Sequence, residues 1–289
     1  DGTPDGEASN YWDAIRAFGY QSSYENIFFY QALLAMSDLE AYQGDAAAAQ
    51  KYADLAANAK QAFNTLFWDA DKGRYITSVD ADGNRVDFGL TFVNFMAAAA
   101  GLADTDKAEQ IYSWLDGTRI VEGDTSTGAD IYGKFSYSAR SNTLDISSTG
   151  KPYYWWDHNG LMPCTPNTLG GYGNQMQNGG TIFYTSYYDL MGRIKTLGAD
   201  NAFTRFQTIM DAFHTNDQLR VFPYTAYGGY VSGVIGEFPE SGLVPLTYVD
   251  GFLGISADTY GLTVAPSLPS SMTYAGVRAY QYNGTVYSI

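Results

Sequence analysis

The feature that most constrains this sequence is a helical hydrophobic periodicity that Gly and Asp interrupt at similar places. Apolar residues recur every three or four positions over residues 22–43 and again over 46–68, which predicts two amphipathic helices. Between them stand Gly44, suited to end one helix, and Asp45, suited to cap the next. Two long helices joined by so short a turn predict an antiparallel αα-hairpin.

The same pattern occurs twice more along the chain. Residues 89–101 and 105–115 form a second helical pair, with Asp104 as the expected N-cap, and residues 179–197 and 201–213 form a third. Hairpins whose helices are separated by similar Gly and Asp residues indicate a helical-repeat architecture. We therefore predict a mainly α fold over residues 1–255.

The segments outside the helices differ in pattern. Asp82-Gly83 predicts a hairpin turn, with residues 74–77 and 85–87 as its strands. Residues 256–289 alternate apolar and polar side chains around Asn283-Gly284, which predicts a small antiparallel β-region. A long segment from 117 to 176 has few helix formers, and long ordered loops usually carry function.

Charge and composition exclude several functions. The chain has 16 Lys and Arg against 31 Asp and Glu, a net charge of −15, which argues against nucleic acid and anionic membrane surfaces as partners. One cysteine and two histidines give no cluster for zinc, and no phosphate-loop or dinucleotide motif is present. We expect no metal and no cofactor. The aromatic content of 16% suits either an aromatic core or a surface that stacks on sugar rings.

Three motifs in consistent order resemble one enzyme group. They are NYWDA at 10–14 with YENIFFYQALLAM at 24–36, QMQNGGTIFYTSYYDLMGR at 175–193, and GEFPESG at 236–242 with YVDGFLGI at 248–255. They are similar to segments of the six-hairpin (α/α)6 glycosidases, which include glycogen-debranching, trehalase-like and glucosidase I-like enzymes. The resemblance implies a carbohydrate substrate and a toroid of αα-hairpins. Three hairpins make half of such a ring, and half a toroid leaves apolar helix faces bare. An N-terminal portion or a partner chain is therefore expected to complete it, with an atypical fold as the alternative.

Hydrolysis of a glycosidic bond needs one protonated and one ionised carboxyl group across the scissile bond. The resemblance places the general acid on Asp13, whose neighbours Tyr11 and Trp12 would exclude water and raise its pKa; an ordinary helix N-cap is the alternative. For the base we expect Glu237, with Glu240 as the alternative. The resemblance implies inversion of the anomeric centre.

Residues for substrate binding are expected in three places. Aromatic faces beside hydrogen-bonding groups suit a sugar subsite, although the stretch around residue 155 could instead be a buried aromatic plug, and Asn178 an N-cap. The predicted binding residues are Tyr11, Trp12, Asn26, Trp155, Trp156, Asp157, His158, Gln177 and Asn178.

Other activities fit the sequence less well. A glycoside phosphorylase needs clustered cationic groups for phosphate, and the Arg residues here are scattered. A toroidal polysaccharide lyase could use His158 or a Tyr as its base, but the charge of −15 disfavours a uronate substrate. A non-catalytic carbohydrate-binding component is the remaining alternative.

Overall fold

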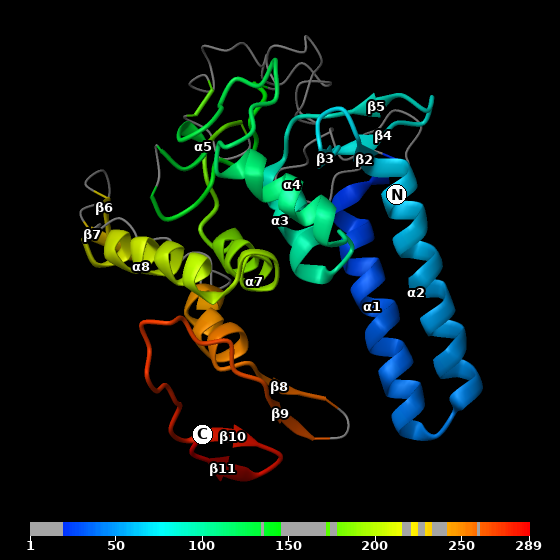
Figure 1. Cartoon of the computed structure of the whole chain (residues 1–289), viewed down its shortest axis with the longest axis vertical. Coiled ribbons are helices and arrows are strands. Elements are labelled where there is room, and N and C mark those ends of the chain that lie inside the picture. Colours follow the sequence, from blue (N-terminus) through cyan, green and yellow to red (C-terminus); the bar gives the residue numbers. More distant parts are fainter. Residues whose placement is uncertain are drawn as a thin grey trace. The chain divides into compact units, whose positions relative to one another are not determined.

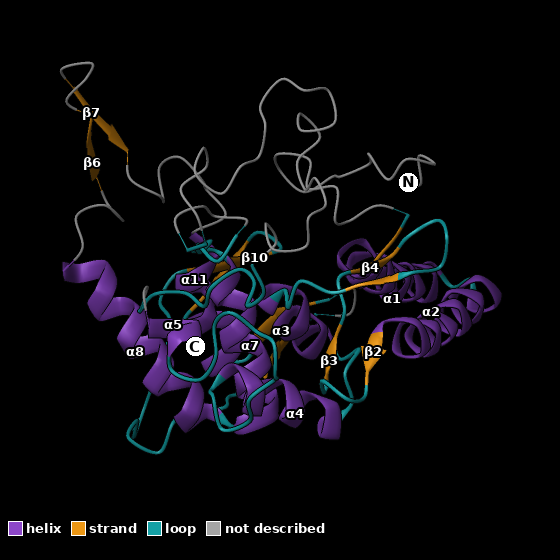
Figure 2. Ribbon diagram, turned by 90° about the horizontal axis from the view of Figure 1, so that it is seen from above, coloured by secondary structure: helices purple, strands orange, loops and turns teal. Residues whose placement is uncertain are grey.

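The computed structural model is mainly helical, with small antiparallel sheets (Figures 1 and 2). It describes residues 20–133, 136–145, 172–173, 178–215, 242–258 and 261–289, and the backbone of 221–224 and 229–232. The predicted mainly α class is confirmed, whereas the toroid stays a prediction.

The chain divides into two compact units. The first comprises Asp1–Phe135 and Ala139–Ile182, and the second comprises Ser136–Ser138 and Phe183–Ile289. A separate β-region from residue 256 onward stays a prediction.

Unit 1 begins with the longest hairpin, formed by α1 (Ser23–Gln43) and α2 (Ala46–Phe67). Gly44 ends α1 in the left-handed conformation, with φ of 88°, which glycine adopts without steric cost. The Asp45 side chain caps α2 by accepting a 2.9 Å hydrogen bond from the backbone N–H of Ala48. The predicted turn residues and both helices are confirmed, with bounds within one residue.

α1 presents apolar side chains on two opposite faces. Ile27 and Leu33 are buried, but a second stripe lies in solvent at spacings of four, three, four and three residues. This exposed stripe consists of Phe28, Ala32, Ala35, Leu39 and Tyr42. Helices that are apolar on more than one side are usually packed on more than one side. Such a stripe agrees with the expectation of a further chain segment or partner over α1, which stays a prediction.

Short strands link the first two hairpins of unit 1. β2 (Trp68–Asp69) pairs with β3 (Arg74–Tyr75), and a second sheet has the order β1 (Gln21–Ser22), β4 (Ser78–Val79), β5 (Arg85–Val86). The predicted strand of residues 74–77 opposite 85–87 is therefore wrong in its register. The Asp80 carboxylate accepts hydrogen bonds from the backbone N–H groups of Asp82 and Asn84, which widens the turn and moves the pairing to β4.

The second hairpin is α3 (Thr91–Ala100) and α4 (Thr105–Leu115). Gly101 is again left-handed, with φ of 78°, and Asp104 again caps the following helix by accepting from the Lys107 N–H. The bounds of α4 and its cap are as predicted; α3 begins two residues later than predicted. Every residue of α3 from Thr91 to Ala98 is buried. α5 (Asp130–Gly133) follows in the same unit.

Unit 2 is built on α7 (Thr185–Leu197) and α8 (Ala199–Thr215). Their core of Phe183, Leu190, Ile209 and Val244 is covered by partly buried aromatic rings. α7 starts six residues later than predicted, because Gly179 has a left-handed φ of 79° and Thr181 forms a β-bridge with Arg140 in unit 1.

The rest of unit 2 is short elements. α11 (Leu243–Leu246) continues into a π-helix, η5 (Thr247–Phe252). β6 (Val221–Tyr224) pairs with β7 (Gly229–Ser232), β8 (Ile255–Ala257) with β9 (Leu262–Val264), and β10 (Tyr280–Tyr282) with β11 (Thr285–Tyr287). The predicted Asn283-Gly284 turn is confirmed: φ is 47° and 75° at these residues, as a type I′ turn requires. In the portion of the chain described, we find no helix whose length and hydropathy would let it cross a bilayer.

Candidate functional site

Two of the predicted site residues, Asn26 and Asn178, belong to the described part of the chain. The others lie outside the described residues: Tyr11, Trp12, Asp13, Trp155, Trp156, Asp157, His158, Gln177, Glu237 and Glu240.

Asn26 lies in the first turn of α1. Its side-chain amide donates a 2.7 Å hydrogen bond to the backbone carbonyl of Ser22, and its side chain is half-buried. The neighbouring Ser23 hydroxyl donates to the carbonyl of Thr77 at 2.6 Å. These bonds fix the first turn of α1 to the small sheet beneath it, so Asn26 is held in one orientation.

Asn178 lies in a buried network of side-chain amides in unit 1. Its amide donates to Asp145 Oδ1 at 2.9 Å, and its oxygen is 3.4 Å from Asn142 Nδ2. Asn142 Oδ1 accepts from the backbone N–H of Gly179 at 2.7 Å. Asn178 therefore does not cap a helix, and that alternative is wrong. The network sets the backbone of the Asn178-Gly179 step.

Arg140 and Tyr172 also contact the segment around Asn178 and Gly179. The Arg140 guanidinium donates to the Gly179 carbonyl at 2.7 Å and to Asp130 Oδ1 at 3.0 Å, and it lies 5.4 Å from the centre of the Tyr172 ring. The Tyr172 hydroxyl donates to Asn142 O at 2.8 Å. Burial raises the pKa of Tyr172 to about 12, so this hydroxyl stays a neutral donor.

Analysis of the sequence missed Arg140, Asn142, Asp145 and Tyr172. The signal available was the long segment after residue 117, which predicted function for the region without distinguishing single residues. Each of them forms a hydrogen bond to a residue at least 30 positions away, for example 37 for Asn142 with Gly179 and 39 for Arg140 with Gly179.

A buried ion network lies next to this region and contacts it through Thr143, the neighbour of Asn142. The Arg74 side chain is 1% exposed, and its guanidinium donates to the carboxylates of Asp87 and Asp124 and stacks on Trp114, 4.6 Å from the ring centre. Thr143 donates to Asp124 Oδ2 at 2.7 Å. Burial alone would raise the pKa of Asp87, but the neighbouring Arg74 and Lys72 cations hold that pKa below its ordinary value.

The first turn of α1 and the Asn142–Asn178 network each contact the start of α3. On one side, the Tyr24 ring of α1 contacts the Phe92 ring edge-on at 5.8 Å. On the other side, the Thr91 N–H donates to Ser141 O at 3.0 Å, and Leu90 forms a β-bridge with Asn142. The structure thus brings the first turn of α1 and the Asn142–Asn178 network to the same end of α3.

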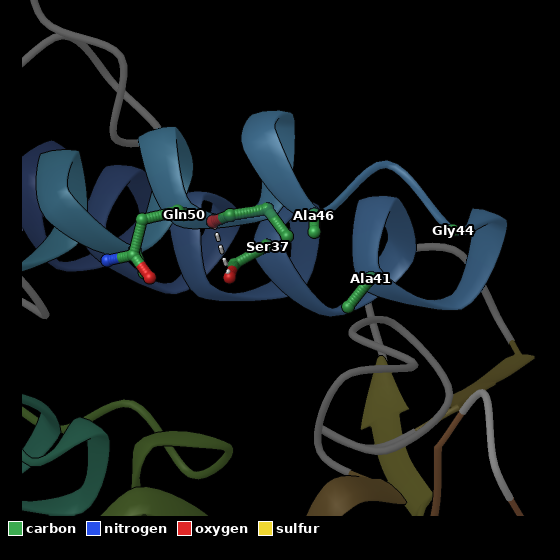
Figure 3. Close-up of a pocket in the computed structure, with 7 residues that line it drawn as sticks. Ser37, Ala41, Gly44, Ala46 and Gln50 are labelled. Carbon is green, nitrogen blue, oxygen red and sulfur yellow. Dashed lines mark hydrogen bonds between the residues drawn. The ribbon is translucent and has the colours of Figure 1, made fainter.

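A separate hollow lies between α1 and α2 near their turn (Figure 3). Its volume is about 260 Å³, and small uncharged residues line it, among them Ser37, Ala41 and Gly44. Ser37 lies eleven residues beyond Asn26, about 16 Å along the helix. This hollow therefore holds none of the predicted site residues. In the described ranges, no group of three or more His, Cys, Asp or Glu side chains is suited to hold a metal ion.

Comparison with known proteins identifies the class of enzyme. Residues 9–126 match the family model described as the mannosylglycerate hydrolase MGH1-like glycoside hydrolase domain, within the six-hairpin glycosidases. No curated protein matches the chain. The matched region includes Asp13, Asn26 and the first two hairpins. The predictions of a glycosidase and of a carbohydrate substrate are confirmed at this level.

Proposed function

We propose that this chain hydrolyses a glycosidic bond in a neutral oligo- or polysaccharide with inversion of the anomeric centre. Asp13 is the proposed general acid, and Glu237 is the proposed base, with Glu240 as its alternative. The observation that carries the proposal is the match of residues 9–126 to a glycoside hydrolase domain, because this segment contains Asp13.

The described side chains support a sugar ligand. Asn26 is half-buried and is fixed by its hydrogen bond to the Ser22 carbonyl, and an amide offers both donors and acceptors to sugar hydroxyls. The Asn142–Asn178 network is buried and fixes the adjacent backbone of Gly179. Both groups border the start of α3. The proposed binding residues are Tyr11, Trp12, Asn26, Trp155, Trp156, Asp157, His158, Gln177 and Asn178.

The net charge bears on the substrate. Mannosylglycerate, named in the description of the matching family, carries a carboxylate. The charge of −15 repels anionic ligands over the range of a Debye length. We therefore propose a neutral glycoside as substrate, with mannosylglycerate as the comparison that tests this choice.

The test is product analysis on p-nitrophenyl glucosides and mannosides of both anomers, maltose, cellobiose and mannosylglycerate. Release of reducing sugar from a neutral glycoside is expected. Sugar phosphate formed only in the presence of inorganic phosphate, or an unsaturated uronate from pectic or alginate polymers, would contradict hydrolysis. Faster cleavage of mannosylglycerate than of every neutral glycoside would contradict the neutral substrate.

The acid is tested by Asp13→Asn, with Asp38→Asn on the exposed surface of α1 as the matched control. On maltose or cellobiose, whose leaving sugar must be protonated, loss of general acid catalysis lowers kcat by about 100-fold or more, and the binding of sugar should persist. A variant that keeps turnover within about three-fold of the wild type would remove Asp13 from the mechanism.

A further inference from the structure

Among the residues that the structure describes, two polar atoms at the start of α1 are buried without a hydrogen-bonding partner. They are Ser22 Oγ and Glu25 Oε2. A buried polar atom without a partner is destabilising relative to the same atom in water, and most such atoms in folded proteins are bonded. Two of them three residues apart need a physical reason.

The sequence Ser22-Ser23-Tyr24-Glu25 has the spacing of a capping box. In that motif the Ser hydroxyl accepts from the backbone N–H three residues on, and the Glu carboxylate accepts from the backbone N–H of the Ser. Ser22 is the N-cap residue of α1, with φ of −100° and ψ of 133°, but its side chain makes no capping hydrogen bond. The box is therefore open, and Ser22 Oγ and Glu25 Oε2 remain unused by the helix.

The backbone around these two side chains is already fixed by other groups. Ser22 lies in β1, paired with Ser78, and its carbonyl accepts from Asn26; the Ser23 hydroxyl bonds the carbonyl of Thr77. The first turn is thus anchored by groups other than Ser22 Oγ and Glu25 Oε2. A side chain on a rigid backbone can bind a ligand without first paying the entropy cost of ordering that backbone.

Burial differs between the two side chains. Ser22 is 5% exposed, whereas Glu25 is half-buried, so that part of its side chain reaches the surface while Oε2 is covered. Burial raises the pKa of Glu25 above its ordinary value. A hydrogen-bond donor from a ligand would offset the burial of this carboxylate.

We propose that Ser22 and Glu25 bind a hydroxyl group of the saccharide beside Asn26, so that the first turn of α1 is a sugar subsite. The Glu25 carboxylate accepts a hydrogen bond from the sugar hydroxyl, and Ser22 Oγ forms a second hydrogen bond with the same hydroxyl. This inference rests on the proposed function, since it takes a carbohydrate as the ligand. Both residues act in binding, and the acid and base roles stay with Asp13 and Glu237 or Glu240.

Glu25→Gln separates this role from a closed capping box. Gln serves in a capping box as Glu does, but it lacks the charge that strengthens a hydrogen bond to a hydroxyl. Glu40→Gln is the control, because it makes the same change on the same helix about four turns away. Ser22→Ala is the second variant.

The full-length chain is titrated with glucose, mannose, maltose and cellobiose by calorimetry, and its thermal unfolding is followed in parallel. A subsite predicts that Glu25→Gln weakens binding of at least one sugar about ten-fold, that Ser22→Ala weakens the same sugar, and that Glu40→Gln changes nothing. A capping role predicts unchanged affinity with a lower Tm for Ser22→Ala. Unchanged affinity in both variants overturns the proposal, as does a wild type that binds none of the four sugars.

Calorimetry measures sugar binding independently of glycoside cleavage. It therefore tests the subsite separately from the proposed hydrolysis. If the wild type binds a sugar through Glu25 but cleaves no glycoside, hydrolysis fails and the subsite stands. If the wild type cleaves glycosides and both variants keep the wild-type KM and sugar affinity, hydrolysis stands and the subsite fails.

Discussion

The two hairpins of unit 1 share their turn chemistry and differ in their burial. Gly44 and Gly101 are both left-handed, and Asp45 and Asp104 both cap the next helix. Yet α3 is buried over eight consecutive residues, whereas α1 leaves one apolar stripe in solvent. Local signals decide where a hairpin forms; residues distant in sequence decide which of its faces is covered.

The groups that bury α3 are distant from it in the sequence. Asn94 in α3 binds both the N–H and the carbonyl of Tyr75, and Thr91 binds the backbone of Ser141. These contacts surround α3 with polar partners as well as apolar ones. Substitutions in this buried region should therefore lower the free energy of unfolding, and substitutions in the exposed stripe should not.

The largest effect is expected for Arg74→Met. It leaves Asp124 buried without its paired cation and leaves Asp87 with Lys72 alone, which costs about 3–5 kcal/mol of unfolding free energy. Urea unfolding measures it, with Arg85→Met as the control, since exposed Arg85 binds only backbone carbonyls. A loss below about 1 kcal/mol would show that the network contributes little.

Leu33→Ala and Leu39→Ala compare the two faces of α1. Leu33 is 6% exposed and Leu39 is 44% exposed. We expect a loss of about 2–4 kcal/mol for Leu33 and within about 0.5 kcal/mol for Leu39, both by urea unfolding. Equal losses would mean that a further chain segment or a partner covers the stripe in solution.

Acid should weaken the region around α3. The pKa of Asp87 is lower in the folded chain than its ordinary value of 3.8, so its contribution is complete above that value and is lost as the pH falls through the lowered pKa. Denaturant unfolding between pH 5 and 2.5 should show this loss, and Asp87→Asn should flatten it. An identical pH dependence in wild type and variant would contradict the ion pair.

Small effects are expected for the caps. Asp45→Ala and Asp104→Ala each remove one capping hydrogen bond and should each cost about 1 kcal/mol. Because both sites are exposed, the two losses should agree despite the different burial of their hairpins. Losses that differ by more than about 1 kcal/mol would show that the tertiary setting also controls the caps.

Much of the fold could be predicted because its signals are local. The bounds of α1, α2 and α4 follow from periodicity ended by Gly and restarted by Asp. The start of α7 could not be predicted, since the left-handed Gly179 and the bridge from Thr181 to Arg140 depend on a segment forty residues earlier.

The same distinction between local and long-range signals applies to the residues of the candidate site. Asn26 and Asn178 are predicted from motifs near them in sequence, and their role in binding stays a prediction. Arg140, Asn142 and Tyr172 were missed, because their roles arise from hydrogen bonds to residues 30 to 39 positions away. A single sequence does not display such pairings.

Proton NMR of the first product tests the central claim most directly. The chain is mixed with the p-nitrophenyl glycoside that it cleaves fastest, and the anomeric protons are followed before mutarotation. Hydrolysis with inversion predicts that the first sugar released has the anomeric configuration opposite to that of the substrate. A first product of retained configuration, or no cleavage of any glycoside in the panel, would contradict the account.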